Sequence, residues 1–144
     1  MLKTNELKLQ FSSKSINESF SRVAVCAFVA SLDPNIEELT DIKTAVSEAV
    51  TNAIVHGYKE KNGKIYITVS IFENNTIRIK IRDKGVGITD IEKAMEPLYT
   101  TAGEERAGLG FAVMESFMDK VRVASRPDMG TTVTMEKKIW GKKL

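Results

Sequence analysis

The chain has 144 residues, of which 42% are hydrophobic and 28% are charged, and its formal net charge at pH 7 is +2. The length and composition predict one folded domain over residues 1–144. The small net charge gives no electrostatic argument for a nucleic-acid partner, and the single cysteine excludes an intrachain disulfide framework. The longest strongly apolar run, residues 23–30, is too short to span a bilayer, and the N-terminus does not resemble a signal peptide, so the expected location is the cytoplasm.

The first predicted elements are a strand and a long helix. Leu7, Leu9 and Phe11 alternate with polar residues, which is typical of a half-buried strand. Ser15, followed three residues later by Glu18, has the pattern of a capping box and predicts a helix that runs to about residue 32.

This first helix has an unusually broad apolar surface. One stripe of apolar residues comprises Ile16, Phe20, Val23, Ala27 and Ala30, and a second group at positions 25, 28, 29 and 32 widens it. Such breadth indicates either a helix central to its own core or a helix buried on two sides, one against the domain and one against a partner protein.

A second helix is predicted over residues 36–56, with Gly57 as the glycine that follows its end. The positions expected to face the core are Ile36, Leu39, Ile42, Val46, Ala49, Val50 and Ala53. Glu48, Asn52 and His56 are spaced four residues apart and therefore lie along one edge of the helix. A carboxylate and a carboxamide one turn apart can hold a hydrated divalent ion and a nucleophile together, although the same pattern also fits a solvated helix edge.

Residues 65–72 and 76–82 predict an antiparallel hairpin, because apolar and polar residues alternate in both runs. Asp83 ends the second strand, and Gly85 and Gly87 follow it. Because glycine has no Cβ, a flat ligand can approach the backbone closely at these positions. Asp83 is placed to accept a hydrogen bond from an exocyclic amine such as that of adenine. An ordinary turn also explains these five residues.

The rest of the chain predicts a short helix after a second capping-box pattern at residues 89–92, a loop over 98–107, and a helix over 111–118. Gly108 and Gly110 precede that last helix, whose N-terminus favours phosphate. Strands follow at 120–125 and 131–137, and Thr131 and Thr132 either line a pocket or are ordinary strand formers. The element order predicts an α+β domain with helices on one face of a mixed sheet.

A basic C-terminal cluster, formed by Lys137, Lys138, Lys142 and Lys143, is expected to be a solvated tail.

Four short motifs follow one another in order: Glu48 with Asn52, then residues 83–87, 108–110 and 130–132. In this order they resemble the N box, the G1 and G2 boxes and the last-strand threonines of the Bergerat-fold (GHKL) ATPases, the group of gyrase, Hsp90, histidine kinases and MutL. More narrowly, residues 5–138 resemble the bacterial anti-sigma serine kinases, most closely those of sporulation. The resemblance implies a two-layer sandwich with helices on one face of a mixed, mostly antiparallel sheet.

The resemblance also implies a site for ATP or ADP with Mg²⁺. Glu48 is then the general base toward a serine hydroxyl, and Asn52 is the Mg²⁺ ligand. The residues implied to bind the nucleotide are Asn52, Asp83, Gly85, Gly87, Thr100, Thr101, Arg106, Gly108, Gly110, Thr131 and Thr132. Residues 98–107 correspond to the ATP lid, where Ala107 replaces the Ser or Thr of many members, and His56 is interpreted as structural.

The partners implied by the resemblance are a sigma factor (sigma F), which is inhibited, and a STAS-type anti-anti-sigma protein, which is phosphorylated on serine. A homodimer is implied as well, without direct nucleic-acid or membrane contact. Arg22 on the first helix and Arg106 are the implied partner contacts. Two alternatives remain: an anti-sigma B kinase of the stress response, and a nucleotide-gated binding module without phosphotransfer. Glu48 favours catalysis, because binding Mg-ATP requires no base there.

Overall fold

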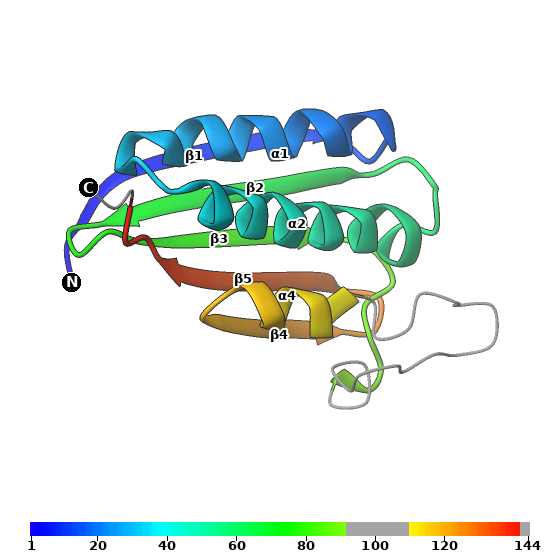
Figure 1. Ribbon diagram of the computed structural model, residues 1–144. Helices are drawn as coiled ribbons and strands as arrows, with labels where there is room; N and C mark the ends of the chain where they lie inside the picture. The colour runs from blue at the N-terminus through cyan, green and yellow to red at the C-terminus, as the bar shows by residue number, and fades with distance from the viewer. Residues whose placement is uncertain (92–109, 142–144) are drawn as a thin grey trace.

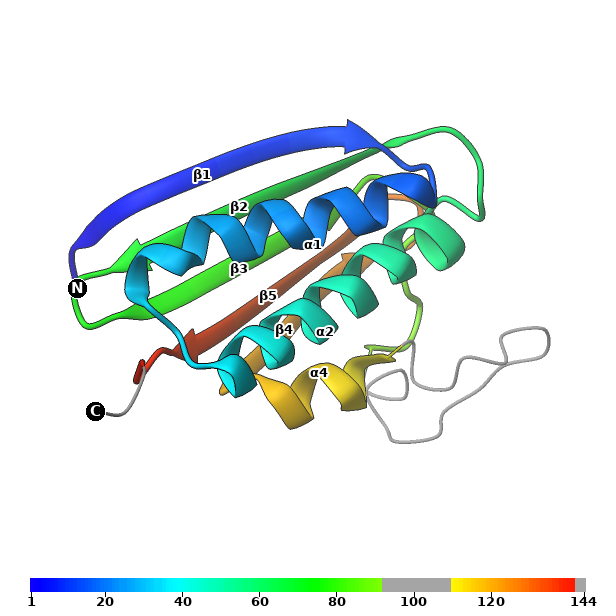
Figure 2. The same cartoon turned by 45° about the horizontal axis from the view of Figure 1, so that its top comes forward.

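The computed structural model describes residues 1–91 and 110–141, and in them one β-sheet carries helices on a single face (Figures 1 and 2). The strands are β1 (Lys3–Ser12), β2 (Lys64–Phe72), β3 (Thr76–Asp83), β4 (Lys120–Arg126) and β5 (Gly130–Lys138), in the spatial order β1-β2-β3-β5-β4. The expected α+β architecture is confirmed.

All four pairings among the described strands are antiparallel, so the sheet is not mixed. Two of the pairs are hairpins, β2 with β3 and β4 with β5. Between β1 and β2 the chain crosses the sheet twice, through α1 (Ile16–Val29) and α2 (Ile36–Asn52). Because two helices rather than one make this connection, β2 runs opposite to β1.

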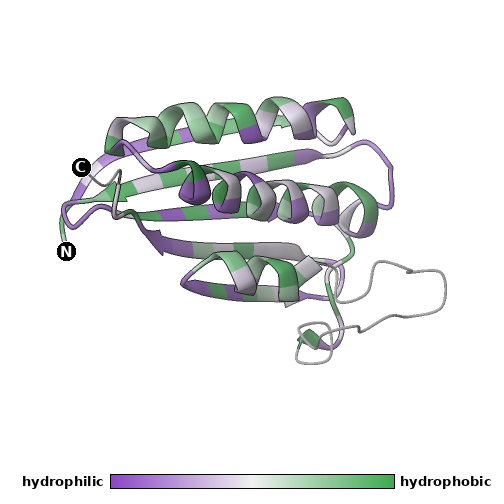
Figure 3. Ribbon diagram, in the orientation of Figure 1, coloured by the Kyte–Doolittle hydropathy of each residue, from purple (hydrophilic) through white to green (hydrophobic). Residues whose placement is uncertain are grey.

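The core lies between the sheet and the helices. On the inner face of the hairpin, Ile67 lies opposite Ile81 and Val69 opposite Ile79, and all four side chains are at most 2% exposed. The alternation of apolar and polar residues along the strands is visible in Figure 3. The buried residues of α2 that pack onto this face include Ile42, Ala45, Val46, Ala49 and Val50.

The first helix forms as expected and continues through a 3₁₀ turn, η1 (Ala30–Leu32), but its start differs. Ser15 has helical dihedral angles (φ −54°, ψ −35°) and makes no capping hydrogen bond through its side chain. The Glu18 carboxylate pairs with Arg22 at 3.1 Å instead. The predicted capping box at Ser15 is therefore wrong.

A capping box does begin the next helix. The Asn35 side chain accepts a hydrogen bond from the Glu38 N–H at 2.8 Å, and the Glu38 carboxylate accepts one from the Asn35 N–H at 2.9 Å. Ile36, which was assigned to the core, is 81% exposed at the first position of α2.

Helix α1 is apolar on two opposite sides. Val25 and Val29 are fully buried. The stripe that begins with Ile16, Phe20 and Val23 points away from the core, and these three side chains are 78%, 61% and 61% exposed. The helix is therefore not enclosed within its own core, and the predicted contact of its outer side with a partner protein stays a prediction.

The C-terminal segment is anchored to α2 and is not a solvated tail as far as the structure describes it. Lys137 is paired with Asp41 at 3.4 Å and donates to the Phe117 carbonyl at the end of α4 (Phe111–Phe117). Lys138 lies over the Trp140 ring, 4.4 Å from its centroid. Lys142 and Lys143 are outside the described residues. None of the described helices is long and apolar enough to cross a membrane.

Candidate functional site

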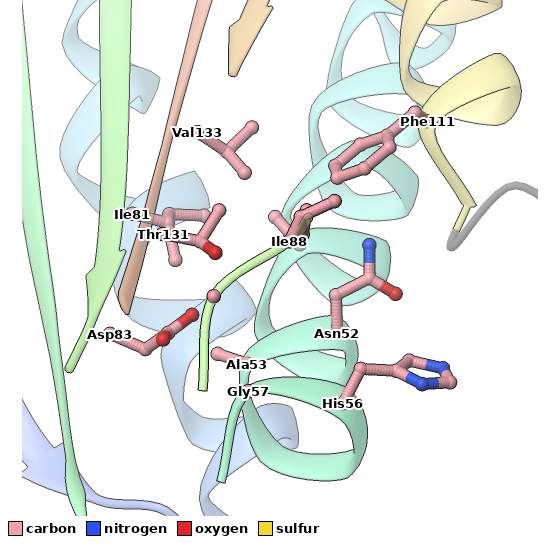
Figure 4. A pocket seen from close by; sticks show the side chains of 12 residues that line it. Asn52, Ala53, His56, Gly57, Ile81, Asp83, Ile88, Phe111, Thr131 and Val133 are labelled. Atoms are coloured by element: carbon pink, nitrogen blue, oxygen red, sulfur yellow. The ribbon is translucent and has the colours of Figure 1, made fainter. Parts of the chain in front are cut away.

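A pocket lies where the end of α2 meets the ends of β3 and β5 and the start of α4 (Figure 4). Its lining is largely apolar, with a few polar groups, and consists of Ala49, Asn52, Ala53, His56, Gly57, Ile81, Asp83, Gly87, Ile88, Phe111, Thr131 and Val133. An apolar pocket with few convergent polar groups is the usual form of a small-molecule site.

Asp83 is the carboxylate of this pocket. It stands at the end of β3 and is 5% exposed. Burial raises the pKa of its carboxyl, although hydrogen bonds from the backbone of Gly85 and Thr131 act in the opposite direction. The Gly85 N–H donates to Asp83 Oδ1 at 2.9 Å. This leaves acceptor capacity on a fixed carboxylate, which suits recognition of an amino group on a flat heterocycle.

The end of α2 holds the loop that follows Asp83. The helix continues as a π-helix, η2 (Ala53–Gly57), immediately after Asn52. π-helical turns of this kind are frequent at functional sites. Here the Val86 N–H donates to the Gly57 carbonyl at 2.9 Å, and the Lys84 N–H donates to the Tyr58 hydroxyl at 2.8 Å.

Gly57 differs from its predicted role as a left-handed helix-ending glycine, because its φ is not positive. A Cβ at this position would lie 2.9 Å from the Asp83 carboxyl carbon. The glycine is therefore required by the close approach of η2 to the pocket carboxylate.

Gly85 and Gly87 are also required by packing within the protein. A Cβ on Gly85 would lie 2.0 Å from the Gly57 carbonyl oxygen, and a Cβ on Gly87, which has φ +76°, would lie 2.0 Å from the Arg126 carbonyl oxygen. The sequence analysis explained these glycines by a ligand that approaches the backbone closely. The two contacts are instead made by carbonyl groups of the protein itself. Gly87 lines the pocket.

Glu48 and Asn52 lie one turn apart on α2, as predicted. Asn52 lines the pocket on the helix side, across from Asp83 and Thr131 on the sheet side (Figure 4). Glu48 is half-buried at the pocket's edge, against Gly110. A Cβ on Gly110, which has φ +75°, would lie 2.3 Å from Glu48 Oε2. The left-handed backbone at this position favours glycine, and the contact shows that the two predicted motifs meet in space.

The two threonines of β5 that were predicted to bind the nucleotide, Thr131 and Thr132, lie on opposite faces of the sheet. Thr131 lines the pocket, and its hydroxyl lies 2.8 Å from Ser125 Oγ. Thr132 faces the other side, where it pairs in register with Arg82, because successive strand residues alternate. Of the two predicted contacts, the structure places only Thr131 with Asp83.

The residues present fit a nucleotide with its metal. Mg²⁺ is usually held by one or two protein oxygens together with phosphates and water. The described part of the chain has no cluster of three or more His, Cys, Asp and Glu residues that could cage a metal alone. The amide oxygen of Asn52, at the mouth of an apolar pocket, is a suitable single ligand for a metal carried by phosphates.

The remaining site predictions divide into three groups. Thr100, Thr101, Arg106 and Gly108, with the expected lid at 98–107, lie outside the described residues. Arg22 is half-exposed on α1 and reaches Ser47 Oγ at 3.5 Å, which places it beside the helix turn that carries Glu48. His56, interpreted as structural, lines the pocket.

The apolar lining was not predicted. Phe111 and Ile88 follow the glycine motifs directly, so a search of the residues flanking each motif could have found them.

Comparison with known proteins agrees with this geometry. The model of the histidine kinase-like ATPase domain matches residues 16–137. An anti-sigma F factor of Bacillus subtilis (strain 168) is 56% identical over 135 residues, 92% of each chain. One from Geobacillus kaustophilus (strain HTA426) is 58% identical over 137 residues, 94% of this chain and 93% of the relative.

Solved structures share the fold at low identity. The RsbU and RsbW domains of Rv1364c from Mycobacterium tuberculosis superpose with a TM-score of 0.68 at 19% identity, over 94% of this chain and 33% of that one. The catalytic domain of histidine kinase ThkA gives a TM-score of 0.58 at 18% identity, over 94% and 97% of the two chains.

Proposed function

Because the chain belongs to the histidine kinase-like ATPase family, and within it to the anti-sigma F factors, we propose that it is an ATP-dependent protein-serine kinase that also sequesters its sigma factor. The sigma factor is of the F type, and the phosphate acceptor is a serine of a STAS-type anti-anti-sigma protein. The protein works as one domain in the cytoplasm.

The observation that carries this proposal is that Asn52 and Asp83 line one apolar pocket, while Glu48 lies one helical turn before Asn52 and against Gly110. Asp83 accepts a hydrogen bond from the adenine amino group at the closed end of the pocket. Asn52, on the opposite wall, faces the phosphates and holds Mg²⁺, which neutralises their charge. Residues 108–110 lead into α4 and bring Gly110 to the same end.

Glu48 acts on the incoming serine. Its carboxylate, fixed against Gly110, orients the hydroxyl and accepts its proton as the phosphoryl group is transferred. The γ-phosphate contacts come from the lid residues Thr100, Thr101 and Arg106, and from Gly108. ATP and ADP differ in those contacts, so the bound nucleotide selects which protein partner is held.

The exposed stripe of α1 forms the homodimer contact, and Arg22 beside it contacts a protein partner. Exposed apolar area of this kind marks an interaction surface.

The second candidate is a nucleotide-gated binding module without phosphotransfer. It needs Asp83 and Asn52 but not Glu48, since binding Mg-ATP requires no base there. An anti-sigma B kinase of the stress response would share the chemistry and differ in its sigma factor.

Glu48→Gln separates the two candidates. It keeps the shape of the side chain but removes the base. We expect phosphate transfer to the anti-anti-sigma protein to fall by about 10²–10⁴-fold, with ATP affinity changed less than about twofold. Transfer is measured by mass spectrometry of the antagonist, and affinity by calorimetry with and without Mg²⁺.

The matched control is Glu37→Gln, an exposed glutamate in the first turn of the same helix, which should retain activity. If the Glu48→Gln variant transferred phosphate as fast as the wild-type protein, Glu48 would not be the general base. If the variant lost both phosphate transfer and nucleotide binding, the role of Glu48 would be structural.

A further inference from the structure

The sheet face opposite the helices is strongly basic. The strand register places on it Lys8, Lys64, Arg78, Lys80, Arg82, Lys120, Arg122, Arg126 and Lys138. The acidic residues that the register assigns to this face are Glu6 and Glu136. Because the net charge of the whole chain is only +2, the positive charge is concentrated on this layer and the helical layer carries the compensating negative charge.

Both carboxylates on this face are already paired. Glu136 accepts from Arg78 Nε at 2.7 Å, and Glu6 lies 3.8 Å from Lys8 and is bonded to Lys3. Lys80 and Arg122 are exposed and make no ion pair with another described residue.

A single row of residues crosses all five strands at the centre of this face. In register it comprises Lys8, Thr68, Lys80, Thr134 and Arg122. Neighbouring strands are about 4.8 Å apart, so the three cations are spaced by about 10 Å. A helix rises 1.5 Å per residue, so carboxylates about seven residues apart, roughly 10 Å, match this spacing. The threonine hydroxyls between the cations can donate to the same partner.

The aromatic rings of this face favour a protein over a nucleic acid. Proteins that bind single strands offer ring faces on which bases stack. Here Arg78 lies over the Phe72 ring at 4.8 Å, and Lys84 lies over the Tyr66 ring at 5.0 Å. Each of these rings therefore already carries a cation of the protein, and Phe72 is only 8% exposed.

A hollow at one end of the face adds a mixed site. It is lined by Arg82 and Arg126 together with Asp83, Ile91, Ala124, Ser125, Met129, Gly130 and Thr132, so one carboxylate stands beside the two guanidinium groups. Two guanidinium groups beside apolar side chains suit a carboxylate that is flanked by apolar residues on a partner.

We propose that this open face docks an acidic helix of a partner protein, laid across the strands along the row from Lys8 to Arg122. The surface lies on the opposite side of the sheet from the nucleotide pocket and from α1. It therefore goes beyond the proposed kinase and sigma-binding functions.

The test uses a fluorescein-labelled, alanine-rich helical peptide of about 21 residues with glutamates repeating every seven residues, and an identical peptide with glutamine. Binding is followed by fluorescence anisotropy at low and physiological salt. The double variant Lys80→Glu, Arg122→Glu reverses two charges of the row. Its matched control, Lys14→Glu, Lys61→Glu, makes the same change in net charge at exposed positions outside the sheet.

We expect the wild-type protein to bind the glutamate peptide and not the glutamine peptide. The row variant should weaken binding about tenfold or more, and the control should stay within about twofold. Thermal unfolding should be unchanged in both variants, because all four side chains are exposed. If the glutamate peptide bound equally weakly to the row variant and to the control variant, the proposal would be overturned, because binding would then depend only on the net charge of the protein. Tighter binding of a short DNA duplex than of the peptide at equal salt, lost in the row variant, would assign the face to nucleic acid instead.

Discussion

Asp83 is a buried carboxylate, and in the proposed function its burial favours ligand binding while it destabilises the nucleotide-free protein. Burial raises the pKa of its carboxyl above the value of an exposed aspartate. Between the unfolded and the folded pKa, the folded state binds more protons, so the free energy of unfolding rises as the pH falls through this window. Nucleotide affinity follows the opposite direction, because a protonated carboxyl loses acceptor capacity toward the adenine amino group.

We therefore expect Asp83→Asn to weaken ATP binding by about 10–100-fold, the loss of one hydrogen bond to a charged group. The thermal midpoint of the nucleotide-free protein should not fall, because the buried charge is removed. In the wild-type protein, ATP affinity should decrease as the pH falls through the raised pKa of Asp83. Calorimetry between neutral and mildly acidic pH measures both effects.

Asp128→Asn, at an exposed turn position with φ +63° that asparagine tolerates, is the control and should change neither quantity. If Asp83→Asn left the ATP affinity unchanged, Asp83 would not be the residue that recognises adenine.

At the level of single residues, the sequence predicted the polar groups of the site better than the reasons for its glycines. Asp83, Asn52 and Glu48 belong to short patterns that carry chemistry. Gly57 and Gly85 are fixed by contacts with groups far along the chain, the Asp83 carboxyl and the Gly57 carbonyl. Such contacts have no local signature.

At the level of elements, Glu38 joins the start of α2 to the end of the chain. Its carboxylate accepts from the N–H groups of Asn35, Trp140 and Gly141 at 2.9, 2.7 and 3.1 Å. Burial alone would raise the pKa of Glu38, but these backbone donors lower it below its usual value. A lowered pKa in the folded state means that Glu38 stabilises the fold above its unfolded pKa, and that this contribution is lost as the pH falls through the folded pKa.

Glu38→Ala should therefore lower the free energy of unfolding by about 2–4 kcal/mol at pH 7, because three N–H groups lose their acceptor. The difference from wild type should shrink in acid. Urea denaturation at neutral and acidic pH measures it. Glu37→Ala, one residue earlier and exposed, should cost less than about 1 kcal/mol. Equal losses in the two variants would show that only helix-end charge matters.

The starts of α1 and α2 show why element boundaries were predicted less well than elements. Ser15 and Glu18 fit the capping pattern, yet Glu18 is engaged by Arg22. The box that forms, Asn35 with Glu38, is equally readable in the sequence. The choice between them depends on tertiary contacts. The π-helical turn after Asn52 likewise depends on the approach of η2 to β3, which no periodicity encodes.

At the level of the whole molecule, the outer side of α1 is the contact that we propose for a homodimer. Phe20→Glu with Val23→Glu places two charges on side chains that are both 61% exposed, so folding should be unaffected. We expect the mass measured by light scattering to fall from dimer to monomer at micromolar concentration. Ile36→Glu, at an 81% exposed position on α2, should remain dimeric. A dimer that survives the double substitution would assign the stripe to another partner.

The two-layer architecture was predictable because it rests on alternation along the strands and on the 3.6-residue period of the helices, which the sequence carries throughout. The hairpin of β2 and β3 was predicted as antiparallel, but the pairings of β1 with β2 and of β3 with β5 join strands that are far apart in the sequence, and alternation along a strand does not specify its partner.

The register of β3 has a further consequence for how such proteins diverge. Arg82 and Asp83 are adjacent in the chain but lie on opposite faces, one on the basic surface and the other in the pocket. A one-residue deletion within β3 would exchange the two faces and destroy both at once. Substitutions, by contrast, can alter one face and leave the other intact. The outward-facing side chains of β3 can therefore be substituted during evolution without loss of the pocket, whereas the number of residues in the strand must stay the same.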